Sequence, residues 1–161
     1  MVGGVVMAEE ACGPPRWFCR TGTHPPSDDG YFENMTRVVF QAGLSWRLIE
    51  RKWVNFKKVF ESFSVNRVAG FSDDDTERLM ADKGIIRNRR KILTTIHNAK
   101  QLLTIKKEFG SIQAYTNTLD KSNNYALVVK ELSKKFKHLG PSSARIFLYS
   151  VGEDIKHIPE G

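Results

Sequence analysis

Apolar residues recur every three or four positions along most of the chain that follows Ser27. This spacing places them on one face of a helix. A first helix is predicted from Ser27 or Asp28 to Gly43, and a second begins at Ser45. The apolar faces of these helices comprise Tyr31, Phe32, Met35, Val38 and Val39, and then Ile49, Trp53, Phe56, Val59 and Phe60. No segment alternates apolar and polar residues as a half-buried strand does, so the pattern predicts an all-α fold.

Glycines and capping residues divide the rest of the chain into further short elements. They predict a short turn at 64–70, a capped helix at 72–84, one long helix at 85–110, a short helix at 111–115, a loop at 121–125, and helices at 126–140 and 141–152. We expect these helices to pack around one core without forming a simple bundle. Residues 1–26 are rich in Gly and Pro and predict an irregular segment ahead of a helical domain at 27–161.

The charge of the chain points to a polyanionic partner. Its 161 residues include 25 Lys and Arg against 18 Asp and Glu, a formal net charge of +7, which favours nucleic acid. The alternative is a soluble protein that is basic for other reasons. No apolar run approaches the roughly 20 residues that span a bilayer. The N-terminus lacks the basic start of a signal peptide, and two cysteines make no disulfide framework. We therefore expect a cytoplasmic protein with free thiols.

The stretch FQAGLSW at 40–46 joins the first two predicted helices. Gly43 can end one helix and Ser45 can cap the next. Neither task requires the large apolar residues Leu44 and Trp46 beside them. These two side chains are either part of the core or a wedge and a stacking platform directed at a ligand.

The stretch KHLGPSSARIFLYSVG at 137–152 resembles the helix–hairpin–helix element of DNA-binding proteins. Gly140 turns the chain and Pro141 sets the entry to the next helix. The N–H groups of Ser142 and Ser143 are then free to bind a phosphate, and Arg145 adds charge. The alternative is an ordinary helix turn that contains a proline.

A second basic stretch, GIIRNRRKI at 84–92, contains Arg87, Arg89, Arg90 and Lys91. On a helix, Arg87 lies one turn from both Arg90 and Lys91. Two or three of these side chains could therefore face a phosphate backbone together. The alternative is a solvated basic surface.

Together, FQAGLSW, VNRVAG, GIIRNRRKI, HNAK, EFGS and LGPSS resemble the DNA-3-methyladenine glycosylase I family, over roughly residues 28–157. The resemblance implies a helix–hairpin–helix glycosylase fold and excision of an alkylated purine, foremost 3-methyladenine, from duplex DNA. It also implies a monomer without cofactor, acting in the prokaryotic cytoplasm at the nucleoid.

The resemblance assigns roles to the stretches described above. The DNA wedge would be Gly43, Leu44 and Ser45, and the base pocket would contain Trp46, Gln41, Val38 and Tyr31. Phosphates would be bound by Gly140, Pro141, Ser142, Ser143, Arg145, Arg87, Arg89 and Arg90.

The chain departs from the family at several positions. Val38 stands where the family has a Glu that reads the amino edge of the base, and the family's Tyr-His-Asp and Glu-Trp-Gly segments are absent. Asp154, after the last predicted helix, is therefore our candidate for the catalytic carboxylate. The family also holds a zinc ion. Here Cys12, Cys19, His24 and His157 could supply ligands, but their spacing differs, so we expect no metal.

These departures leave three hypotheses. The first is a glycosylase acting on alkylated purines. The second is a helix–hairpin–helix DNA-binding protein that has lost excision, and the third is a glycosylase for another damaged base with fewer donors. A concave site with a carboxylate near Trp46 would favour an enzyme over a binding protein.

Overall fold

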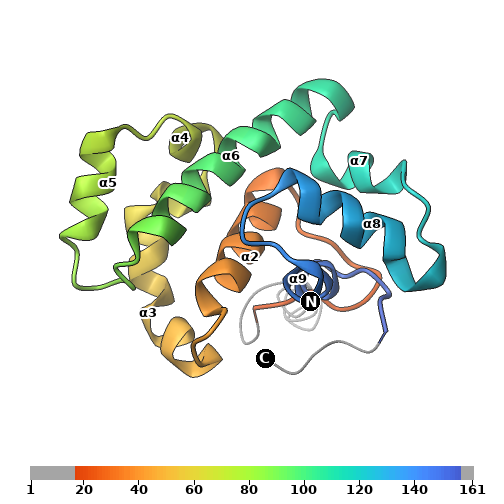
Figure 1. Cartoon of the computed structure of the whole chain (residues 1–161), viewed down its shortest axis with the longest axis horizontal. Helices are drawn as coiled ribbons and strands as arrows, with labels where there is room; N and C mark the ends of the chain where they lie inside the picture. The colour runs from red at the N-terminus through yellow and green to blue at the C-terminus, as the bar shows by residue number, and fades with distance from the viewer. Residues whose placement is uncertain (1–16, 157–161) are drawn as a thin grey trace, which may run out of the picture.

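The longest helix, α6 (Arg89–Phe109), crosses the molecule diagonally (Figure 1), and α2, α4, α5 and α7 pack against it. The computed structural model describes residues 17–156, and this range contains no strand. The prediction of an all-α fold with many short helices is therefore confirmed. The other elements are α2 (Asp28–Gln41), α3 (Trp46–Val59), η1 (Glu61–Phe63), α4 (Val65–Ala69), α5 (Asp73–Met80), α7 (Ile112–Asn117), α8 (Ser122–Lys135) and α9 (Pro141–Ser150).

The apolar faces predicted for α2 and α3 form the centre of the core. The largest fully buried side chains include Phe32, Phe40, Phe56, Phe60 and Phe63. The rings of Phe56 and Phe60 pack on the ring of Phe40 at the end of α2. The helix that carries the predicted wedge is therefore anchored by aromatic packing on one side.

Several predicted helix boundaries are wrong. Helix α5 ends at Met80 instead of Gly84, and two further errors fall next to candidate DNA contacts. Helix α6 begins at Arg89 instead of Ile85, because the Asn88 side chain accepts a hydrogen bond from the Lys91 N–H at 3.1 Å and caps the helix there. Arg87 thus precedes the helix and does not share a helical face with Arg90 and Lys91. Helix α8 ends at Lys135 instead of Gly140, so 136–140 form the hairpin loop before α9.

The predicted loop at 121–125 is a left-handed turn at the start of α8. Asn123, Asn124 and Tyr125 have φ angles of +54°, +54° and +66°, a conformation that Asn tolerates better than most residues. None of the helices within 17–156 is long and apolar enough to cross a membrane.

Candidate functional site

The elbow at 42–45 joins α2 to α3 much as its residues predict. Gly43 has φ +83°, in the left-handed region that favours glycine. The Ser45 Oγ accepts a hydrogen bond from the Leu48 N–H at 3.1 Å and caps α3. Gln41 donates from Nε2 to the Leu44 carbonyl oxygen at 2.9 Å, which closes the turn. Gly43 and Ser45 are exposed and Leu44 is half-buried, so the tip of the elbow faces solvent.

Lys91 attaches the elbow to α6. Its ammonium group donates to the carbonyl oxygens of Phe40 at 3.1 Å and Ala42 at 2.9 Å. Both carbonyls lie at the C-terminal end of α2, where a cation also interacts favourably with the helix dipole. Burial lowers the pKa of Lys91 from its ordinary value. The two stretches FQAGLSW and GIIRNRRKI are therefore in direct contact.

Trp46, the first residue of α3, is part of an aromatic stack. Its ring lies on the ring of Trp17, with centroids 4.9 Å apart and an interplanar angle of 23°. The guanidinium group of Arg37 lies on the Trp17 ring, 5.4 Å from its centroid. Arg37 also lies 4.4 Å from the ring centroid of Trp53. One face of Trp46 is thus covered by a residue of the N-terminal segment.

Arg37 is a buried charge that the sequence analysis missed. It is 8% exposed, and its Nη2 lies 3.5 Å from Oε2 of Glu33. The same Glu33 oxygen accepts a hydrogen bond from Nε1 of Trp53 at 2.8 Å. Burial lowers the pKa of Arg37 to about 10, although the charge of Glu33 acts in the opposite direction. The spacing of four residues between Glu33 and Arg37 is the signal that could have revealed the pair.

The other residues assigned to the base pocket lie deeper in the protein. Val38 is 1% exposed and belongs to the hydrophobic core. Tyr31 is 3% exposed and packs edge-on against Phe147. Among the described ring pairs, Tyr31 is not in contact with Trp46. Burial raises the pKa of Tyr31, whose hydroxyl has no hydrogen-bond partner.

The hairpin before α9 contains the residues predicted to bind a phosphate. Helix α9 begins at Pro141, and the carbonyl oxygen of Gly140 accepts its first hydrogen bond from the Ala144 N–H at 2.8 Å. Ser142 is exposed and Ser143 half-buried beside it. Arg145, however, donates from Nη1 to the Asn124 carbonyl oxygen at 3.1 Å, so its guanidinium is partly used within the protein.

The three arginines of the second basic stretch differ in their surroundings. Arg89 forms a bidentate ion pair with Glu77, with distances of 2.6 and 3.0 Å. Arg87 and Arg90 are exposed and have no ion pair with any residue in the described range. These two cations are therefore available to a ligand, whereas the charge of Arg89 is largely balanced.

The two carboxylates after α9, Glu153 and Asp154, differ in their burial and in their partners. Asp154 is 65% exposed and lies 2.5 Å from Nζ of Lys156. Glu153 is 6% exposed, and its Oε1 accepts hydrogen bonds from Lys121 Nζ and Tyr125 OH, both at 2.9 Å. Burial and the neighbouring Glu153 raise the pKa of Tyr125 to about 12. The buried carboxylate in this loop is thus Glu153, which the sequence analysis did not select.

Two of the four conceivable zinc ligands, Cys12 and His157, lie outside the described residues. Cys19 is disulfide-bonded, which corrects the expectation of free thiols and removes a thiolate ligand. His24 Nδ1 lies 2.7 Å from the Val151 carbonyl oxygen. Residues 17–156 contain no group of three or more His, Cys, Asp and Glu side chains that could hold a metal ion.

The sequence model of the methyladenine glycosylase family matches residues 20–157. DNA-3-methyladenine glycosylase 1 of Escherichia coli K12 is 42% identical over 66 residues, which cover 41% of this chain and 35% of that protein. DNA-3-methyladenine glycosylase of Haemophilus influenzae is 32% identical over 76 residues, which cover 47% of this chain and 41% of that protein. The aligned segments thus span 35% and 41% of the length of these two curated relatives.

Solved structures match over a longer stretch. A crystal structure of 3-methyladenine DNA glycosylase I has a TM-score of 0.71 and 28% identity, with 83% of each chain covered. The Staphylococcus aureus 3-methyladenine DNA glycosylase I, solved to explain 3-methyladenine recognition, has a TM-score of 0.69 and 25% identity, with 88% of each chain covered. The predicted family and fold are both confirmed.

Proposed function

The chain belongs to the methyladenine glycosylase family, and from this premise we propose that it excises an alkylated purine, foremost 3-methyladenine, from duplex DNA in base-excision repair. The observation that carries the proposal is the elbow with its exposed tip, held by Lys91 and followed directly by the half-buried ring of Trp46. Relatives and structural neighbours named for this activity support it.

In the proposed complex, Leu44 enters the space that the flipped nucleotide leaves in the duplex. Gly43 allows the sharp turn, and the hydrogen bond from Gln41 to the Leu44 carbonyl oxygen keeps the wedge in place. Unpairing and unstacking one base costs a few kcal/mol, which is least for a damaged base. The N–H groups of Ser142 and Ser143, with Arg87 and Arg90, hold phosphates and position the duplex without reading its sequence.

The flipped base would stack against the Trp17–Trp46 pair. N3-methylated adenine is cationic, so an aromatic face favours it over the neutral base by about 1–2 kcal/mol where water is excluded. The positive charge also makes the base a good leaving group. The C1′–N9 bond breaks, the bonding electron pair leaves with the base, and a water oxygen bonds to C1′ as it loses a proton. Asp154 remains our candidate for the group that stabilises the sugar cation or accepts this proton.

We also propose that the protein acts as a monomer on duplex DNA in the bacterial cytoplasm. The family relatives from bacteria support this location. No bound metal is part of the proposed mechanism.

Three observations favour a second candidate function, a DNA-binding protein without excision. Trp17 covers one face of Trp46, and Val38 provides no acceptor for the amino group of adenine. Arg37, close to Trp17, also places a buried positive charge near the proposed base site. The same features are compatible with a glycosylase for a different, uncharged base.

Release of free bases from methylated duplex DNA, separated by chromatography, tests the proposal. Release of 3-methyladenine is expected. Release of another base alone would support the third hypothesis. Absence of any release, with salt-sensitive binding to duplex DNA intact, would support the DNA-binding alternative.

A further inference from the structure

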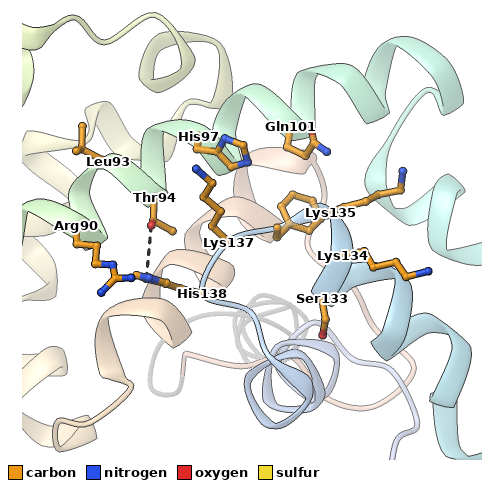
Figure 2. Close-up of a pocket in the computed structure, with 11 residues that line it drawn as sticks. Arg90, Leu93, Thr94, His97, Gln101, Ser133, Lys134, Lys135, Lys137 and His138 are labelled. Atoms are coloured by element: carbon orange, nitrogen blue, oxygen red, sulfur yellow. Dashed lines mark hydrogen bonds between the residues drawn. The ribbon is translucent and has the colours of Figure 1, made fainter.

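A groove lined by basic side chains runs between α6 and the hairpin (Figure 2). Its volume is about 880 Å³, within the range of ligand sites in proteins. The groove is lined by Arg90, Leu93, Thr94, His97, Gln101, Ser133, Lys134, Lys135, Phe136, Lys137 and His138. The lining residues include four lysines and arginines and two histidines but no carboxylate. An anionic ligand would therefore not be repelled by a negatively charged side chain in the lining.

The cations at one end of the groove are not used by the fold. Figure 2 shows the head groups of Arg90 and His138 near one another and Lys137 reaching from the hairpin toward His97. Within residues 17–156, neither Arg90 nor Lys137 has an acidic partner, whereas Lys134 lies 3.6 Å from Glu131. Two unpaired cations in one hollow repel each other, which disfavours the empty groove and favours a bound anion.

Hydrogen bonds join the two sides of the groove. The Asn98 side chain donates from Nδ2 to the Lys137 carbonyl oxygen at 3.1 Å and accepts from the Lys137 N–H at 2.9 Å. The hydroxyl of Thr94 lies 3.5 Å from Nδ1 of His138. These contacts hold the hairpin against α6, so Arg90 and Lys137 project from two elements that are connected to one another.

The groove is continuous with the proposed DNA-binding elements. Arg90 is adjacent in sequence to Lys91, which holds the elbow at Ala42. Lys137 and His138 come just before Gly140 and Pro141 of the hairpin. One end of the groove thus lies between the wedge and the phosphate-binding turn, and from there it extends along α6 to Gln101. A DNA strand that contacts both elements would pass this end.

We infer that the groove between α6 and the hairpin binds the phosphodiester backbone of the same duplex, with Arg90 and Lys137 as its principal contacts. This inference rests on the proposed function for its ligand, but it concerns the binding of DNA and not the chemistry. The groove would contact phosphates outside the flipped nucleotide, which accounts for a basic surface larger than the hairpin alone requires. Such contacts raise affinity for any sequence, damaged or intact.

The salt dependence of binding to an undamaged duplex tests the inference. Each phosphate contact contributes about 0.9 to the slope of log K against log salt concentration. The double variant Arg90→Gln/Lys137→Gln should reduce the magnitude of this slope by about 1.8 and weaken binding about sixtyfold near 0.1 M salt. The matched control is Lys107→Gln, an exposed lysine on α6 about 25 Å along the helix from Arg90. Its slope should stay close to that of the unmodified protein.

The inference would be overturned if the salt dependence of binding were as steep in the double variant as in the control. Circular dichroism of each variant verifies that the helices are intact. As a second readout, the ring signals of His97 and His138 in NMR spectra should shift when undamaged duplex is added. A shift with millimolar inorganic phosphate but not with duplex would also overturn it, because the groove would then be a small-anion site. None of these measurements requires excision, so they remain decisive if no base is released.

Discussion

The ammonium group of Lys91 lies 2.9 Å from the carbonyl oxygen of Ala42, which joins the first turn of α6 to the elbow between α2 and α3. The same group also binds the Phe40 carbonyl oxygen. The side chain therefore sets where the tip of the elbow, with Leu44, lies relative to the hairpin, which Asn98 fixes to the same helix. We regard Lys91 as a positioning residue for the wedge.

Replacing Lys91 by Met should loosen the elbow. Two carbonyl oxygens lose their partner, and we expect the free energy of unfolding to fall by about 1–3 kcal/mol in urea titrations. Single-turnover base excision should slow more than tenfold, while affinity for undamaged duplex changes little. Lys107→Met is the control for the loss of one charge on α6. Excision at the normal rate in Lys91→Met would show that the wedge is positioned by other contacts.

Trp17→Ala should reduce excision by at least tenfold, because the flipped base would lose half of the aromatic pair against which it stacks. Phe18, the neighbouring aromatic residue, provides a control as Phe18→Ala. Excision that increases in Trp17→Ala would contradict this account. It would mean that Trp17 covers the face of Trp46 that the base requires.

The effects of replacing Glu33 and Arg37 on the free energy of unfolding should not be additive. Arg37→Met leaves Glu33 with fewer partners in a half-buried site, and Glu33→Gln leaves Arg37 buried without its counter-charge. We expect the double variant to be less destabilised than the sum of the single variants by about 1–2 kcal/mol. Chemical denaturation of the four proteins measures this coupling. Additive effects would show that the Trp17 and Trp53 rings, not the carboxylate, stabilise the guanidinium.

Affinity for DNA should rise as the pH falls from 7.5 to 5.5. Burial lowers the pKa of both His97 and His138, with further lowering by Lys137 and Lys100 near His97 and by Arg90, Lys91 and Lys137 near His138. Both rings are therefore neutral at pH 7. A phosphate in the groove raises their pKa, so binding is coupled to proton uptake. Titrations of fluorescent duplex at fixed salt measure the effect, which should shrink in His97→Gln/His138→Gln.

The same two shifts predict the opposite trend for stability. A histidine with a lowered pKa in the folded state binds its proton more readily when unfolded. The contribution of neutral His97 and His138 to the free energy of unfolding is complete above about pH 6.5, the ordinary pKa of histidine. It is lost as the pH falls through and below that value. Tighter DNA binding at low pH together with lower stability of the free protein would therefore be consistent. Pairing the two titrations excludes a general effect of pH on folding.

Much of the fold follows from local patterns in the sequence. The apolar faces of α2 and α3, the Gly43 turn and the Ser45 cap depend on residues close to one another in the chain, and the structure confirms them. The predicted start of α6 lies four residues too early, because Ile85, Ile86 and Arg87 suit a helix, whereas the side chain of Asn88 caps the helix later.

The candidate site was harder to predict because its main contacts join distant segments. Lys91 belongs to a basic stretch of which two or three side chains could face a phosphate backbone, but its ammonium group binds the elbow, 49 residues away at Ala42. The stack of Trp17 on Trp46 and the burial of Arg37 also result from tertiary packing, as does the groove between α6 and the hairpin. Apart from the four-residue spacing of Glu33 and Arg37, no periodicity or spacing along the chain encodes these contacts.

The central claim is that the elbow and Trp46 form the base site of an active glycosylase. The most direct test is single-turnover release of 3-methyladenine from duplex DNA by the unmodified protein and by Trp46→Ala, at protein concentrations that saturate the DNA. The account predicts release by the unmodified protein and a loss of at least a hundredfold in Trp46→Ala with duplex binding retained. Equal release by both proteins, or none by the unmodified protein, would contradict it.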